Sequence, residues 1–178
     1  DISTASGSCI DLNEKKSIIL TVAHFCEEKE VPESDIKEML EDLPIDESKT
    51  SVLTKFRVVL FDGSTHDVKV IKFDSKEDLC LMEIVNGKCK NKIEIANNYP
   101  KKYSKVSTLS APLSIFSPTN VLVFDGRYIG IENNNFIFTL PSTYGSSGSP
   151  VINDNLELVS IIKMSTKGFQ QISIGTNL

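Results

Sequence analysis

The feature that most restricts the fold is a series of short segments rich in β-branched and aromatic residues, separated by polar turns. It opens with a hairpin of Ser6–Ile10 and Ser17–Val22, and turns such as Asp62-Gly63-Ser64 recur along the rest of the chain. About a dozen short strands with a single helix are typical of an all-β barrel or sandwich. The other predicted strands are Leu53–Phe61, Asp67–Phe73, Leu79–Val85, Lys92–Ala96, Lys105–Ser110, Thr119–Phe124, Tyr128–Glu132, Phe136–Leu140, Leu156–Met164 and Phe169–Ile174.

One segment departs from the strand pattern. Residues 32–43 carry apolar side chains at helical spacing, acids in the first turn, and a proline at each end. This predicts an inserted acidic helix that either seals one end of the β-structure or forms a lid or partner surface near His24. The polar, proline-containing stretch Lys88–Tyr103 is the expected joint between two halves.

Charge is distributed unevenly along the 178 residues, although the net charge is only −5. Residues 27–49 contain ten acidic residues and three lysines, whereas residues 88–105 contain six lysines and one glutamate. The basic stretch could bind nucleic acid or another polyanion. Because charge runs are usually only solvated, a solvated connector is favoured, and nucleic acid stays open as a disfavoured partner.

Several classes of protein and site are disfavoured. No apolar run approaches the roughly 18 residues of a membrane-spanning helix, and no signal peptide is recognisable, so a soluble chain of unknown compartment is expected. The chain begins without methionine and could be excised from a longer protein. With no C-x-x-C pair and two histidines, neither a metal site nor a cofactor is indicated.

The four cysteines leave their pairing open. Cys80 lies inside an apolar strand and is interpreted as a buried free thiol. Cys9 and Cys26 flank the same early region and could form a disulfide, but sequence alone cannot settle connectivity.

The run Tyr144–Pro150, Tyr-Gly-Ser-Ser-Gly-Ser-Pro, lies between two apolar strands. Glycines on both sides of a serine let the backbone turn sharply and present N–H groups beside an exposed hydroxyl. A serine hydroxyl is a weak nucleophile, so it needs a base, and a histidine base needs a carboxylate to orient it. Taken alone, the run favours an ordinary turn, because Gly/Ser-rich turns between strands are common.

Suitable partners for the serine occur upstream. His24 follows the apolar strand ending Leu20-Thr21-Val22-Ala23, whereas His66 falls in a polar turn and is expected to be exposed. Asp78 opens the apolar strand Leu79–Val85 and is the candidate carboxylate, although an acid there is often only a solvated strand end.

Taken together, these segments resemble a known family. Thr21-Val22-Ala23-His24, Asp78-Leu79-Cys80-Leu81 and Gly145-Ser146-Ser147-Gly148-Ser149-Pro150 are similar, in that order, to the T-A-A-H, D-[IL]-A-L and G-D-S-G-G-P signatures of chymotrypsin-like serine proteases. The similarity is closest to the HtrA-like and compact viral, polyprotein-processing branches, on the segment from Asp62 to Ile84.

The resemblance implies an all-β fold of two six-stranded antiparallel β-barrels with the acidic helix inserted near residues 32–43. Residues 1–90 would form the first barrel, with His24 and Asp78, and residues 91–178 the second, with Ser147. His24 would act as base, Asp78 would orient it, and the N–H groups of Gly145 and Ser147 would form the oxyanion hole. The enzyme would be a serine endopeptidase acting on polypeptides, which could include its own polyprotein.

Departures from the signatures carry further implications. Ser146 replaces the aspartate that pairs with a freed N-terminal amine in zymogen-activated members, so that route of activation is not expected. Ser149 replaces a glycine. Cys26 lies one place beyond the cysteine of the digestive members, which puts the family disulfide in doubt.

The resemblance also suggests a specificity pocket. Its base would be Pro141, so no acid stands there to select Lys or Arg. A small or medium uncharged side chain is expected before the scissile bond, whereas an inward-facing Lys163 would favour an acidic one. The weakly indicated lining residues are Pro141, Ser142, Tyr144, Met164 and Ser165.

Two alternatives from other classes stay open. One is a protease-like module retained for binding through the acidic helix or the basic stretch 88–105. The other is a structural β-protein with a chance motif, which would leave the order histidine, aspartate, serine unexplained.

Overall fold

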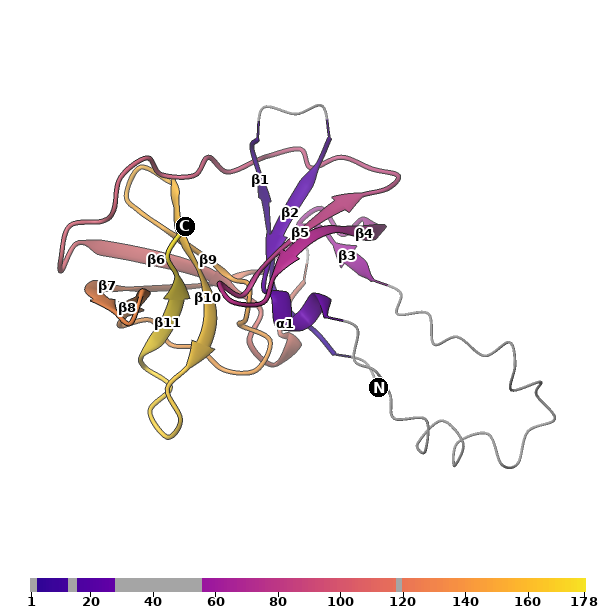
Figure 1. Cartoon of the computed structure of the whole chain (residues 1–178). Coiled ribbons are helices and arrows are strands. Elements are labelled where there is room, and N and C mark those ends of the chain that lie inside the picture. Colours follow the sequence, from indigo (N-terminus) through magenta and orange to yellow (C-terminus); the bar gives the residue numbers. More distant parts are fainter. Residues whose placement is uncertain (1–2, 13–15, 28–55, 118–119) are drawn as a thin grey trace, which may run out of the picture.

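The computed structural model describes residues 3–12, 16–27, 56–117 and 120–178. The predicted acidic helix at residues 32–43 lies outside these residues. Within them, a first β-sheet (indigo to magenta in Figure 1) is followed by a second β-structure (salmon to yellow) that packs beside it. No helix in this part of the chain is long and apolar enough to cross a membrane.

The first β-structure is an antiparallel sheet of five strands in the order β1-β2-β5-β4-β3. One helical turn, α1, follows directly from the end of β2 (Figure 1). The central pair β2 and β5 is built from β-branched and apolar residues, as expected for buried strands. The elements are β1 (Ser8–Ile10), β2 (Ile18–Thr21), α1 (Ala23–Cys26), β3 (Arg57–Val59), β4 (Thr65–Asp74) and β5 (Leu79–Ile84).

The second β-structure is a closed barrel of six strands in the order β10-β11-β8-β7-β6-β9. Its elements are β6 (Lys105–Ser110), the 3-10 turn η2 (Pro112–Ser114), β7 (Leu122–Glu132), β8 (Asn135–Phe138), β9 (Pro150–Ile152), β10 (Leu158–Ser165) and β11 (Ser173–Thr176). The predicted all-β double-barrel fold is confirmed. The described first sheet has five strands and is half of a barrel, whereas the second barrel has the expected six and is closed.

Four strand predictions were wrong in detail, and one of them, Lys92–Ala96, forms only isolated bridges at Ile93 and Ile95. The predicted strands Thr119–Phe124 and Tyr128–Glu132 are parts of one long strand, β7, because Gly126 continues the strand where a turn was expected. A Cβ on Gly126 would lie 2.3 Å from the Thr139 carbonyl oxygen, so glycine serves close packing there. The last strand, β11, lies four residues later than the start predicted at Phe169.

One apolar cluster fills the barrel, and another joins the barrel to the first sheet. The barrel is filled by aromatic and aliphatic side chains, with Tyr128 and Phe136 meeting edge-on at 5.2 Å between ring centroids. A second cluster joins Ile10, Leu20 and Val22 of the first sheet to Leu158 and Ile161 of β10. Since this contact is apolar and fully buried, it fixes the first sheet against the barrel.

One buried hydroxyl in the barrel predicts a stabilising substitution. Thr108, on the inner face of β6, is fully buried, and its Oγ1 has no hydrogen-bond partner among the described residues. A buried, unpaired hydroxyl destabilises the folded state by about 1–3 kcal/mol. We expect Thr108→Val to raise the melting temperature by about 2–4 °C for each kcal/mol added to the free energy of unfolding. Thr139→Val is the control, because it removes a hydroxyl that accepts the Arg127 N–H at 2.8 Å, and it should lower the melting temperature.

Candidate active site

His24 and Asp78 come together where the central strand β2 ends and the central strand β5 begins. His24 lies in α1, directly after β2, and Asp78 immediately precedes β5, which pairs with β2. His24 Nδ1 lies 2.9 Å from Asp78 Oδ2, and the His24 backbone N–H donates to Oδ1 at 2.9 Å. Asp78 has φ +55, a left-handed conformation that aspartate tolerates better than most residues. The carboxylate thus holds both the ring and the backbone of His24.

The prediction of a free thiol at Cys80 was wrong, and Cys9, whose pairing the sequence left open, forms a disulfide with another cysteine. Cys80 is not a free thiol but is bonded to Cys26, and Cys9 is bonded to Cys89 rather than to Cys26. The alternation of β5 turns Cys80 inward beneath α1, where Cys26 is buried as well. The Cys26–Cys80 disulfide therefore runs alongside the His24–Asp78 pair, two residues further along each segment.

The loop before β9 depends on two glycines. Gly145 has φ +86 and Gly148 has φ +83, both in the left-handed region. A Cβ on Gly148 would lie 1.9 Å from the Ser6 carbonyl oxygen, and one on Gly145 would lie 2.7 Å from the Ala111 carbonyl oxygen. Both positions therefore require glycine, and they set the turn that carries Ser147. We name residues 143–149 the serine loop.

Ser6, from the segment before β1, holds the serine loop from outside the barrel. Its backbone N–H donates to the Ser147 carbonyl oxygen at 2.7 Å, and its hydroxyl donates to the Gly145 carbonyl oxygen at 2.9 Å. Thr21 in turn donates to the Ser6 carbonyl oxygen at 2.7 Å. Sequence reasoning assigned Ser6 only to an opening strand, and no local signal indicates this long-range role.

The N–H groups of Gly145 and Ser147 have no acceptor among the described residues, whereas the carbonyls of the same peptides do. The Tyr144 carbonyl accepts from the Leu113 N–H at 2.7 Å, and the Ser146 carbonyl accepts from the Ser149 N–H at 3.0 Å. In a trans peptide the N–H points opposite to the carbonyl. Each N–H is therefore directed away from these partners.

Ser147 Oγ donates to the Lys163 carbonyl oxygen at 3.5 Å, a long and weak hydrogen bond. Among the described residues, no hydrogen bond joins Ser147 to His24. The structure thus brings His24 and Asp78 into contact and places Ser147 in the serine loop, without joining all three.

His66, the other histidine, is the second residue of β4 and pairs with Val58 of β3. Nδ1 lies 2.8 Å from the Asn86 carbonyl oxygen and Nε2 lies 2.9 Å from Ser64 Oγ. It is half-buried rather than exposed as predicted, because its ring packs on Gly87. One ring nitrogen thus contacts the β3–β4 turn and the other contacts the segment after β5.

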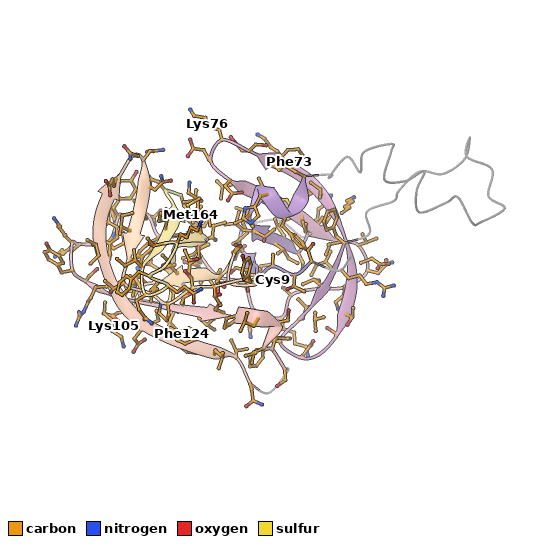
Figure 2. The ribbon with its side chains drawn as sticks, turned by 90° about the horizontal axis from the view of Figure 1, so that it is seen from below. Cys9, Phe73, Lys76, Lys105, Phe124 and Met164 are labelled. Carbon is orange, nitrogen blue, oxygen red and sulfur yellow. A yellow bond between two sulfur atoms is a disulfide. The ribbon has the colours of Figure 1, made fainter. Side chains whose placement is uncertain are left out.

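A pocket of about 220 Å³ lies beside the serine loop and contains no charged side chain. It includes Pro141 and Ser142 of the predicted specificity pocket but not Tyr144, Met164 or Ser165. Tyr144 is 86% exposed and Met164, labelled in Figure 2, is 52% exposed. The lining residues are Pro112, Phe124, Pro141, Ser142, Thr143, Gln170 and Gln171. Sequence reasoning missed the glutamines because it placed them in the predicted strand Phe169–Ile174, whereas they lie in the turn before β11.

Part of the basic stretch 88–105 forms ion pairs. Lys90 contacts Asp62 at 2.8 Å, and Lys105, labelled in Figure 2, contacts Asp125 at 3.0 Å. The hydrogen bond from Lys90, together with those from Ser64, holds the pKa of the Asp62 carboxyl well below its usual range. These pairs fit a solvated connector better than a surface kept free for a polyanion.

The sequence matches a known family of peptidases. Residues 5–161 match the family model of the trypsin-like peptidase domain, and the chain belongs to this family of serine peptidases. A search of curated proteins gives no match.

Two solved structures share the fold. One is an inactive serine-to-alanine mutant of Rv3671c from M. tuberculosis H37Rv, at 12% identity and a TM-score of 0.69, covering 97% of this chain and 75% of that chain. The other is the serine endoprotease from Yersinia pestis, at 19% identity and a TM-score of 0.72, covering 99% of this chain and 54% of that chain. This chain therefore spans about half the length of the Yersinia protein.

Proposed function

We propose that this serine peptidase is an endopeptidase that hydrolyses peptide bonds with His24, Asp78 and Ser147 as its catalytic triad. The observation that carries the proposal is the His24–Asp78 pair, with Nδ1 and Oδ2 2.9 Å apart, in a chain whose serine loop requires Gly145 and Gly148. With the Nδ1 proton held by Asp78, Nε2 is the nitrogen left to accept a proton.

The reaction would proceed through an acyl-enzyme. Ser147 Oγ attacks the peptide carbonyl carbon while His24 Nε2 takes the hydroxyl proton, and the carbonyl electron pair moves to the oxygen. The N–H groups of Gly145 and Ser147 would bind that oxyanion. Collapse breaks the C–N bond, and His24 gives its proton to the leaving amine. Water then cleaves the ester by the same steps, which releases a carboxylic acid and restores Ser147.

Incubation with a peptide library made from a whole proteome tests this function. Mass spectrometry should detect new termini that increase with time and with enzyme concentration. A folded protein that produces none would contradict the proposal and would favour a module retained for binding.

The same library tests the proposed side-chain preference. Pro141 stands at the predicted base of the pocket, and no charged residue lines the neighbouring cavity. We expect cleavage mainly after small or medium uncharged side chains, because neither a cationic nor an anionic side chain would find a partner there. Dominant cleavage after Lys or Arg would show that the pocket has been placed wrongly.

The two disulfides allow a matched test of the His24–Asp78 pair. They close loops of 54 and 80 residues, so removing either should cost a similar free energy of unfolding, about 4 kcal/mol. Only Cys26–Cys80 lies beside the pair. We expect Cys26→Ala/Cys80→Ala to lower kcat about 10- to 100-fold, as small misplacements of catalytic groups do. Cys9→Ala/Cys89→Ala should keep most of the activity, measured where both variants are folded. Equal losses of kcat would contradict this prediction.

A further inference from the structure

Three buried serines form a chain of hydroxyls across the base of the serine loop. Ser149 donates to Ser110 at 3.0 Å, and Ser110 donates to Ser146 at 3.0 Å. Ser146 Oγ also accepts the Thr143 backbone N–H at 3.2 Å. All three serines are at most 2% exposed. Such a chain, closed off from water, is a strong constraint on the backbone that carries it.

The position of Ser110 follows from the strand pairing. β6 pairs with β9 with Thr108 opposite Val151, and Ser110 is the next inward-facing residue of β6. Its side chain therefore meets the serine loop where the loop enters β9. Ser110 contacts the loop on both sides of Ser147, through Ser146 immediately before it and Ser149 two residues after it.

The hydrogen-bonded hydroxyls connect two positions at which this sequence departs from the family signature. Position 146 has serine in place of aspartate, and position 149 has serine in place of glycine. Considered singly, each is a small polar substitution in a turn. In the fold, both hydroxyls bind the same third serine, so the departures act together rather than independently.

We propose that Ser110 is a positioning residue that holds the serine loop in its catalytic conformation through Ser146 and Ser149. The inference rests on the proposed function, since it concerns how Ser147 and the N–H groups of Gly145 and Ser147 are held. Ser110 does not touch substrate. It holds the loop on either side of the nucleophile from inside the barrel, while Ser6 holds the carbonyls of Gly145 and Ser147.

Substitution of Ser110 by alanine tests the proposal in the whole chain. The change removes two hydrogen bonds and little volume. We expect kcat and the second-order rate of labelling by a fluorophosphonate probe to fall about 10- to 100-fold, because the loop that carries the nucleophile shifts. KM should change less than about threefold, since substrate contacts remain.

A double-mutant cycle separates positioning from a general loss of stability. Ser146→Ala removes the same hydrogen bond from the loop side, so it should show a similar loss of kcat, and Ser110→Ala/Ser146→Ala should be little worse than either single variant. Thr108→Val is the matched control, two residues earlier on the same face of β6, and should leave kcat unchanged. If Ser110→Ala does not fold, Ser146→Ala alone must show the loss.

The outcomes separate this inference from the function on which it rests. Wild-type protein that is folded but never labelled would contradict the proposed function. Wild-type protein that is labelled, with Ser110→Ala and Ser146→Ala labelled at the same rate, would show that the hydroxyl chain is only structural. The inference would also be overturned if the losses of kcat in Ser110→Ala and Ser146→Ala multiplied in the double variant.

Discussion

Replacement of Ser147 by alanine is expected to abolish peptide hydrolysis, with a fall in kcat of about 10⁵- to 10⁶-fold. The reason is chemical, because alanine offers no atom that can form the acyl-enzyme ester. The fold should be unaffected, since the one hydrogen bond lost is the 3.5 Å contact with the Lys163 carbonyl oxygen. Activity is measured as the rate of new peptide termini, and folding by the thermal unfolding midpoint.

Ser75→Ala is the matched control for this change. Ser75 is an exposed serine in the β4–β5 turn, and its substitution should leave the rate within about the error of measurement for a surface change. If Ser147→Ala retained more than a hundredth of the wild-type rate, another nucleophile would be responsible.

Asp78→Asn is expected to have the second-largest effect, a fall in kcat of about 10⁴-fold. Asparagine keeps an oxygen that can accept the His24 backbone N–H, now 2.9 Å from Asp78 Oδ1, so α1 should stay in place. An amide cannot stabilise the positive ring that forms during proton transfer, and it can favour the wrong tautomer. The measurement is kcat against pH, together with the unfolding midpoint.

Asp74→Asn provides the control within the same turn. Asp74 accepts the N–H groups of Lys76 and Glu77 at 2.9 and 3.1 Å, so it also has a structural role, but among the described residues it forms no hydrogen bond or ion pair with His24. Its substitution should lower stability slightly and leave kcat nearly unchanged. Similar losses for the two asparagine variants would contradict the role proposed for Asp78.

Local patterns predicted the parts of this fold that depend on neighbouring residues. The strands of the first sheet and barrel follow from β-rich segments, and the conformation of Gly145 and Gly148 follows from a turn that only glycine allows. The contact of His24 with Asp78 was predicted only through the resemblance. Without the resemblance, nothing in the sequence around Asp78 indicates which side chain its carboxylate contacts.

The predictions that failed concern contacts between residues that are distant in sequence. Cys80 looked like a free thiol because its partner, Cys26, lies in a helix turn that only the fold brings above β5. Gly126 looked like a turn because the close approach of the Thr139 carbonyl is not visible along the chain. The link from Ser110 to the serine loop depends on the β6–β9 register, which sequence patterns do not specify.

The most direct test of the account is to find which atom of the folded protein a fluorophosphonate probe modifies. Wild-type protein should take up one probe per chain, and mass spectrometry of the digested adduct should place it on Ser147. Labelling should be lost on unfolding and in Ser147→Ala, and it should slow strongly in His24→Ala. A probe attached to another serine, or a folded wild-type protein that takes up none, would contradict the assignment of Ser147 as the nucleophile.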